Sequence, residues 1–254
     1  MRFKGKVVVV TGSGRGIGRS IGLGFAGQGA AVVVNALHAE HVNRVVKEVQ
    51  ALGAQAIPAV ADVSTQRGVR LLFDIASRQL GKVDILVNNA GMNIVKPAVE
   101  FSEKEWDRVN SVNLKSTFLC SKAAAELMIP QKWGRIINIS SIVGINPFPF
   151  RAPYATSKAG VIMLTRELAI EWAKYNIQVN AIAPGFFKTD MLIDRIKEGT
   201  INEKAILRRV PMGRLGDVNE IVNLALFLAS EQSSYVTGQV IAVDGGYTAY
   251  GFVE

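Results

Sequence analysis

Tyr154 and Lys158 stand four residues apart in the segment Tyr-Ala-Thr-Ser-Lys, which the sequence predicts to be helical. Side chains at positions i and i+4 project from one face of a helix, so the phenol and the ammonium would share a cavity. A free tyrosine has a pKa of about 10 and exchanges protons poorly near neutral pH. A neighbouring cation lowers that pKa, so the pair could serve as a general acid or base. An ordinary half-exposed helix can carry the same pair, and other motifs must decide between the two interpretations.

A glycine-rich segment follows the apolar, β-branched run from Lys6 to Thr11. It reads Gly12-Ser-Gly-Arg-Gly-Ile-Gly18, and helical spacing then continues to Gly29. Where a strand turns into a helix, unpaired N–H groups and the positive end of the helix dipole face one point. Glycines let that backbone approach a pyrophosphate closely. The segment therefore predicts a dinucleotide-binding loop.

The end of the second expected strand, at 30–36, lacks an acidic residue. In a dinucleotide-binding unit an acid there bonds the adenosine ribose hydroxyls and repels a 2′-phosphate. The segment reads Asn35-Ala-Leu-His38 instead, and Arg15 and His38 could approach a phosphate. The alternative interpretation is that both histidines are simply exposed to solvent, His38 in the loop and His41 at the start of the next helix. The sequence thus favours NADP over NAD.

Strand-like and helix-like segments alternate along the remaining chain. Further strands are expected at 54–60, 83–88, 134–139, 177–183 and 239–243, and helices at 39–52, 65–80, 102–111, 112–128, 154–175 and 217–229. The helical segment 191–210 lies beside the expected strand ends, where such segments often form a lid. No linker interrupts the pattern, which predicts a single-domain α/β fold: a doubly wound parallel sheet with helices on both faces.

Composition and net charge limit the classes of protein to which the chain could belong. The 254 residues are 49% hydrophobic, enough for one sizeable core, and the net charge of +8 is scattered rather than gathered into a nucleic-acid site. We expect no membrane span and no signal peptide. Cys120 is the only cysteine and lies in an apolar helical segment, so we expect an inert thiol, no internal disulfide and a cytoplasmic location. No His or Cys cluster has metal-ligand spacing, so no metal is expected.

Taken together, these motifs resemble the short-chain dehydrogenase/reductase family over nearly the whole chain. The matching segments are Thr11 to Gly18 for its cofactor motif, Asn88-Asn-Ala-Gly91 for its strand-four motif, and Pro184-Gly185 with Thr189 for the segment that holds the nicotinamide. The resemblance implies a Rossmann-type domain of seven parallel strands and a homotetramer. Residues 1–95 would form the dinucleotide-binding part and residues 96–254 the catalytic and substrate part, with a lid-like segment at about 188–212.

The resemblance also implies a catalytic group of Asn113, Ser141, Tyr154 and Lys158. Tyr154 would exchange a proton with the substrate, Lys158 would lower the pKa of Tyr154 and bond the nicotinamide ribose, and Ser141 would polarise the substrate oxygen. Asn113 would position a water behind Lys158. The cofactor-binding residues expected from the motifs are Gly12, Ser13, Gly14, Arg15, Gly16, Ile17, Gly18, Asn35, Asp62, Val63, Asn89, Ala90, Gly91, Tyr154, Lys158, Pro184, Gly185, Phe187 and Thr189.

Two branches of the family compete for the substrate class. The runs 171–180, 184–191 and 244–250 are similar to gluconate and related sugar-acid or polyol dehydrogenases, which implies interconversion of a secondary alcohol and a ketone. The alternative is a 3-oxoacyl-[acyl-carrier-protein] reductase. Lys132 matches one basic carrier-docking position of that branch, but Tyr175 stands at the other, while the loop 146–150 and the segment 193–207 are apolar enough for an acyl chain. A dinucleotide-sensing regulator is disfavoured because all four catalytic members are present.

Overall fold

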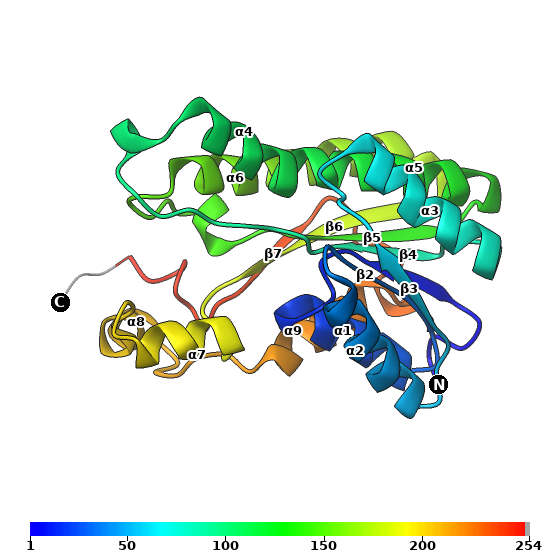
Figure 1. Ribbon diagram of the computed structural model, residues 1–254, viewed down its shortest axis with the longest axis horizontal. Coiled ribbons are helices and arrows are strands. Elements are labelled where there is room, and N and C mark those ends of the chain that lie inside the picture. The colour runs from blue at the N-terminus through cyan, green and yellow to red at the C-terminus, as the bar shows by residue number, and fades with distance from the viewer. Residues whose placement is uncertain (252–254) are drawn as a thin grey trace.

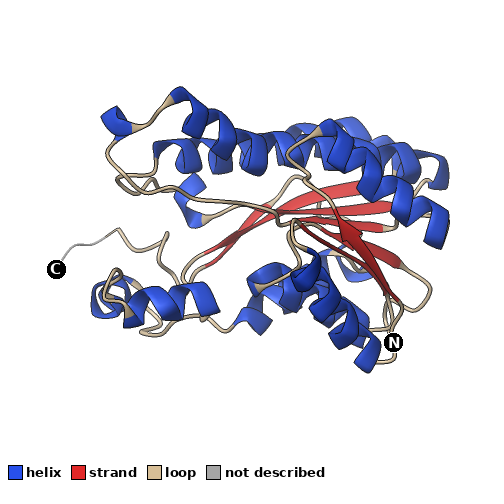
Figure 2. Cartoon of the chain, viewed as in Figure 1, coloured by secondary structure: helices blue, strands red, loops and turns tan. Residues whose placement is uncertain are grey.

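Seven parallel strands form one sheet through the middle of the molecule (Figures 1 and 2). The computed structural model describes residues 1–251. The strands are β1 (Val7–Val10), β2 (Ala31–Ala36), β3 (Ala56–Val60), β4 (Ile85–Asn88), β5 (Gly134–Ile139), β6 (Ile177–Pro184) and β7 (Val240–Val243). Their order, β3-β2-β1-β4-β5-β6-β7, confirms the doubly wound sheet predicted from the sequence. The central strands β1 and β2 contain continuous Val runs because both faces of the sheet are covered there.

Helices cover both faces of the sheet (Figure 1). One layer contains α1 (Gly16–Gly27), α2 (Ala39–Ala51) and α9 (Val218–Leu228), and the other contains α3 (Gln66–Leu80), α4 (Glu103–Asn110), α5 (Ser116–Gln131) and α6 (Ala152–Trp172). Alternate strand residues point to opposite faces of the sheet and pack in two hydrophobic cores. Val8 and Val10 lie in the first core, under α1, α2 and α9, and Val7 and Val9 lie in the second, under α3, α5 and α6. None of the helices that the structure describes has both the length and the apolarity to span a bilayer.

Two helical segments differ from their predicted form. The expected helices at 102–111 and 112–128 are one continuous rod, because a π-helical turn, Ser111–Lys115, joins α4 to α5. Such turns widen a helix by one residue and often occur at functional sites. The expected lid segment 191–210 is two short helices, α7 (Asp190–Lys197) and α8 (Glu203–Arg209), because the chain turns at Gly199 with φ of 72°.

A chain of buried polar side chains crosses the second core. Asn88 donates from Nδ2 to Ser121 Oγ (2.9 Å) and to Asn138 Oδ1 (2.8 Å), and Asn138 Nδ2 donates to Thr165 Oγ1 (2.9 Å). Thr165 in turn donates to the Val161 carbonyl (2.7 Å) within α6. These contacts join β4 and β5 to α5 and α6 by side chains alone.

Cys120 lies in the same core and is fully buried. Burial raises the pKa of its thiol to about 12, because the thiolate would lose its hydration there. The prediction of a buried, inert thiol is confirmed.

Candidate active site at the carboxyl ends of the strands

The glycine loop lies between β1 and α1 and is clamped to the end of β4. Thr11 Oγ1 accepts hydrogen bonds from the backbone N–H groups of Asn89 and Ala90, both at 3.0 Å. Asn89 Nδ2 donates back to the carbonyl of Gly12 (3.0 Å), and a Cβ atom at Gly12 would lie only 2.8 Å from Ala90 Cα. β1 and β4 are the neighbouring strands at which the chain changes direction across the sheet, the place where open α/β sheets bind ligands.

The N-terminus of α1 fits the pyrophosphate of a dinucleotide. Arg15 at the N-cap makes no side-chain capping bond, and the first turn carries no acidic residue. A Cβ atom at Gly16 would meet nothing within 4 Å, so the backbone there borders open space. Uncapped N–H groups at the positive end of the helix dipole favour an anion in that space.

Three of the predicted cofactor residues point away from the cleft and support the loop from beneath. Ser13 donates to the Val10 carbonyl (2.8 Å) and is fully buried. Asn35 is 1% exposed; its Nδ2 donates to the carbonyls of residues 59 and 61 (3.0 and 3.1 Å), and its Oδ1 accepts from Gly12 N (3.4 Å). Ile17 packs against the first core. Their side chains therefore fix the conformation of the loop.

Basic side chains gather where the glycine loop meets the end of β2. A Cβ atom at Gly14 would lie 3.0 Å from Ala36 Cβ and 2.7 Å from His41 Cβ, so no side chain separates the loop from this corner. Arg44 Nη2 donates to the Gly14 carbonyl (2.8 Å). The sequence motifs did not identify Arg44, because it lies one turn inside α2 and reaches the loop only through tertiary packing. Glu40 is the nearby acid, but its side chain is 80% exposed and lies beside His41.

Asp62 and Val63 follow β3. Asp62 Oδ1 accepts hydrogen bonds from the N–H (3.0 Å) and hydroxyl (2.6 Å) of Ser64, and Arg108 of α4 lies 3.5 Å from its other oxygen. Burial acts to raise the pKa of Asp62, but the Ser64 bonds and the Arg108 charge lower it below its usual value. Val63 is buried beneath this loop.

Asn113 sits in the π-helical turn and is fully buried. Its Oδ1 accepts from Met92 N (2.8 Å), and its Nδ2 donates to Met92 O (3.0 Å) and Ser157 Oγ (2.9 Å). Both amide donors are thus occupied by protein groups. Asn113 ties the loop after β4 to the helix that carries Tyr154.

Lys158 is buried at the centre of this arrangement, 4% exposed, and donates to the Ile139 carbonyl at the end of β5 (2.7 Å). Burial lowers its pKa to about 8. A Cβ atom at Gly91 would lie 3.6 Å from Lys158 Nζ, and one at Gly144 would lie 2.7 Å from the Lys158 carbonyl carbon. Gly144, in the 3-10 turn Ile142–Gly144 after β5, is a second residue that sequence motifs missed.

Ser141 and Tyr154 flank Lys158. Ser141 is buried and accepts from Val143 N (3.1 Å), and Lys158 Nζ lies 5.8 Å from the centre of the Tyr154 ring. Burial raises the pKa of Tyr154, opposed by the Ser141 side chain and the charge of Arg151. This direction is opposite to the expected lowering by Lys158, because burial disfavours the phenolate more than the Ser141 hydrogen bond and the Arg151 charge favour it. Tyr154 is therefore a protonated phenol at neutral pH in the unliganded chain.

The residues after β6 close the far side of the cleft. Gly185 packs against the end of β7, where a Cβ atom would lie 2.8 Å from Asp244 Cβ. Phe187 is buried against the first core, and Thr189 caps α7 by accepting from Leu192 N (3.3 Å). Pro184 is buried as the last residue of β6. Of these side chains, that of Phe187 packs within the protein, whereas the partly exposed Thr189 hydroxyl accepts one hydrogen bond and can still donate one to a ligand.

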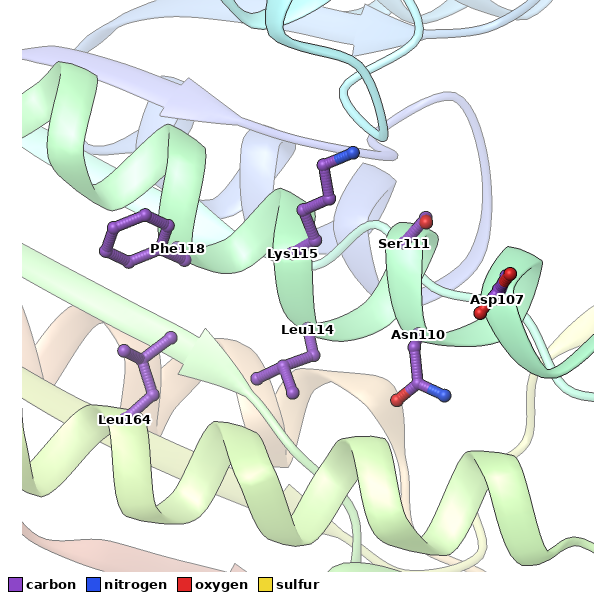
Figure 3. A pocket seen from close by; sticks show the side chains of 7 residues that line it. All are labelled: Asp107, Asn110, Ser111, Leu114, Lys115, Phe118 and Leu164. Carbon is purple, nitrogen blue, oxygen red and sulfur yellow. The ribbon is translucent and has the colours of Figure 1, made fainter.

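A hollow of about 530 Å³ lies on a different surface, the outer side of the π-helical turn, α5 and α6 (Figure 3). Phe118, Leu114 and Leu164 line it together with polar side chains of α4 and the turn. Neither Tyr154 nor Lys158 borders it, so this hollow is separate from the strand-end cleft.

Comparison with known proteins matches almost the whole chain. The sequence model of the family described as Enoyl-(Acyl carrier protein) reductase matches residues 12–248. The 3-oxoacyl-[acyl-carrier-protein] reductase FabG of Thermotoga maritima is 42% identical over 97% of this chain and 99% of its own. Gluconate 5-dehydrogenase of Gluconobacter oxydans is 39% identical over 97% and 96%. The crystal structure of a gluconate 5-dehydrogenase from Burkholderia cenocepacia in complex with NADP and tartrate superposes with a TM-score of 0.92 at 38% identity, covering 98% of this chain and 97% of that one.

Proposed function

The chain belongs to the short-chain dehydrogenase/reductase family, and we propose on that basis that it interconverts a secondary alcohol and a ketone of a sugar acid or polyol, using NADP. The observation that carries this proposal is the convergence of Ser141, Tyr154 and Lys158 beside the glycine loop. Hydrogen bonds and close backbone approaches connect these residues across β1, β4, β5 and α6.

Tyr154 exchanges the proton of the substrate oxygen in the proposed reaction. Bound NADP would supply or accept the hydride at the carbinol carbon. Ser141 holds and polarises the substrate oxygen, and Lys158 offers a positive charge that stabilises the phenolate when Tyr154 has given up its proton. Asn113 positions these groups by fixing the loop at Met92 to α6 through Ser157.

The preference for NADP rests on the corner at the end of β2. Ala36 leaves no carboxylate to repel a 2′-phosphate. Arg15 and Arg44, whose guanidinium bonds the Gly14 carbonyl, provide positive charge beside the same loop. Guanidinium groups match the geometry of phosphate oxygens. The Burkholderia enzyme, of known structure with NADP, supports the same choice of cofactor.

The sugar-acid substrate class is supported by the relatives. Two of the compared proteins carry gluconate 5-dehydrogenase in their names, and one of them was crystallised with tartrate, a hydroxy acid. A 3-oxoacyl-[acyl-carrier-protein] reductase is the second candidate, because Phe148, Phe186 and Tyr247 form an aromatic surface on which an acyl chain could pack.

We also propose that the chain assembles as a homotetramer in the cytoplasm. Phe118, which lines the hollow of Figure 3, is 44% exposed, and Met163 and Ile170 of α6 are 60% and 79% exposed. β7 is an apolar edge strand whose residues are all partly exposed. Exposed apolar surface of this kind is usually covered by another subunit.

The deciding experiment compares kcat/KM for 5-ketogluconate with kcat/KM for an acetoacetyl thioester, each with NADPH and with NADH. We expect the keto acid to be the better substrate and NADPH the better cofactor. A thioester advantage of tenfold or more would assign the chain to the reductase branch, and failure to reduce either compound would contradict the proposed function.

A further inference from the structure

Among residues 1–251, three arginines near the N-terminus of α6 and in α7 and α8 have no carboxylate partner. Arg151 is the N-cap residue of α6, Arg195 lies in α7 and Arg209 ends α8. None of them takes part in an ion pair among residues 1–251, whereas four other arginines do: Arg19, Arg108, Arg135 and Arg214. The three cations are therefore not explained by pairing within the chain.

Two of these cations flank a wall of three aromatic rings. Phe148 and Phe186 are stacked, with centroids 6.1 Å apart and an interplanar angle of 9°, and Tyr247 packs against both at 5.5 and 5.6 Å. The Arg151 guanidinium carbon lies 5.5 Å from the centre of Phe148, and that of Arg209 lies 5.0 Å from the centre of Tyr247. Cation–π contact orients both guanidinium groups. Arg151 also donates from Nε to the Pro149 carbonyl (3.2 Å), which leaves its two Nη groups without a protein acceptor among residues 1–251.

Arg195 of α7 is a second cation whose charge acts on Arg151. Burial lowers the pKa of Arg151, the phenol of Tyr154 acts in the opposite direction, and the charge of Arg195 lowers it further. Arg151 is thus close enough to both Arg195 and Tyr154 to interact electrostatically, and it is only partly exposed. The like charges of Arg151 and Arg195 repel each other, and an anion that binds both would relieve that repulsion.

We propose that Arg151 and Arg195 bind the carboxylate of the substrate, with the aromatic wall of Phe148, Phe186 and Tyr247 beside its carbon chain. A guanidinium can bind a carboxylate through two parallel N–H bonds, which sets orientation as well as affinity. Arg151 is the N-cap of α6, three residues before Tyr154, and interacts electrostatically with that phenol, so a carboxylate held there places a neighbouring part of the substrate near the phenol. This inference rests on the proposed function, because it names the substrate class of that same site as hydroxy or keto acids.

The test measures binding and turnover separately, with D-gluconate and with D-glucitol, an uncharged polyol of the same carbon number. Calorimetry on the NADP complex should show that Arg151→Gln and Arg195→Gln each weaken D-gluconate binding at least tenfold. In turnover, kcat/KM for D-gluconate should fall at least tenfold, mainly through KM, while that for D-glucitol changes less than twofold. Arg208→Gln, at an exposed arginine beside Arg209 in α8, is the matched control and should leave D-gluconate binding unchanged.

The outcomes separate this inference from the proposed function. Wild-type protein that turns over D-glucitol but does not bind D-gluconate, or variants that lose both substrates equally, would overturn the carboxylate site alone. Turnover of a thioester without binding of D-gluconate would overturn both the carboxylate site and the proposed function. A selective loss of activity on a phosphate-bearing acyl thioester, with D-gluconate unaffected, would also overturn it and assign the arginines to a phosphate. Arginine-dependent binding of D-gluconate without any turnover would uphold the site and refute the proposed function.

Discussion

Replacement of Lys158 by methionine should stabilise the unliganded fold at neutral pH while abolishing activity. The fall of the lysine pKa from its ordinary 10.5 to about 8 means that the folded chain disfavours the ammonium form. At 1.36 kcal/mol per pKa unit, this corresponds to a cost of about 3 kcal/mol. The variant also loses the hydrogen bond from Nζ to the Ile139 carbonyl, worth about 1 kcal/mol. The expected net gain is about 2 kcal/mol in the free energy of unfolding.

The gain should depend on pH in a defined direction. Below pH 8 the lysine is protonated in both the folded and the unfolded chain, so the wild type carries the full cost of burying the charge. Between pH 8 and 10.5 the folded lysine is neutral and the unfolded one still protonated, so the cost declines as the pH rises. Above this range the lysine is neutral in both states, and only the lost hydrogen bond should distinguish the two proteins.

Urea unfolding followed by tryptophan fluorescence measures this difference, at pH 6.5, 8 and 9.5 and without cofactor. Wild type and Lys158→Met must be compared at one protein concentration, because subunit assembly adds to apparent stability. A difference between the two proteins that is the same at all three pH values would refute the argument that a buried charge destabilises this site. Loss of stability in the variant at pH 6.5 would do so as well.

Four further changes test other parts of the structure. Tyr154→Phe should lower kcat at least about a hundredfold with nearly unchanged cofactor affinity, since it removes only the proton donor; a variant with most of its activity would contradict that role. Ala36→Asp should shift the ratio of kcat/KM from NADPH toward NADH by repelling the 2′-phosphate, and a wild type at least tenfold better with NADH would contradict the assignment. Gly144→Ala should cost about 1 to 3 kcal/mol of unfolding free energy and reduce kcat, because its Cβ would lie 2.7 Å from the Lys158 backbone. Phe118→Asp should yield smaller assemblies by light scattering, because it places a charge on an exposed apolar surface. An unchanged mass would show that this face is not a subunit contact.

The parts of the site that could be predicted from the sequence are those fixed by backbone geometry. A glycine turn between a buried strand and a helix requires the same residues wherever it occurs, and the Tyr154–Lys158 spacing follows from the helix itself. Arg44 and Gly144 act on the site through contacts between distant segments, for which no local pattern exists. Their roles therefore became visible only in the folded chain.

Sequence motifs also could not predict which way a side chain points or how deeply it is buried. Ser13 and Asn35 occupy motif positions, but their polar groups satisfy buried backbone atoms and do not face the cleft. The direction of the Tyr154 pKa depends on how much water the folded chain removes from the phenol, which spacing cannot reveal. The doubly wound parallel architecture could be predicted because alternating strands and helices leave few parallel topologies, whereas the order of the strands was not predicted.

The buried polar chain from Asn88 to Thr165 fixes the rotation of α6 about its own axis. Thr165 follows Tyr154 by eleven residues, which is close to three full helical turns, so both side chains leave the helix in nearly the same direction. Rotating α6 by one residue would turn Thr165 about 100° from Asn138 and leave amide groups unpaired in the core. A mutation at Asn138 or Thr165, about 16 Å along the helix from Tyr154, would thus disturb catalysis by allowing α6 to rotate and move the phenol out of position.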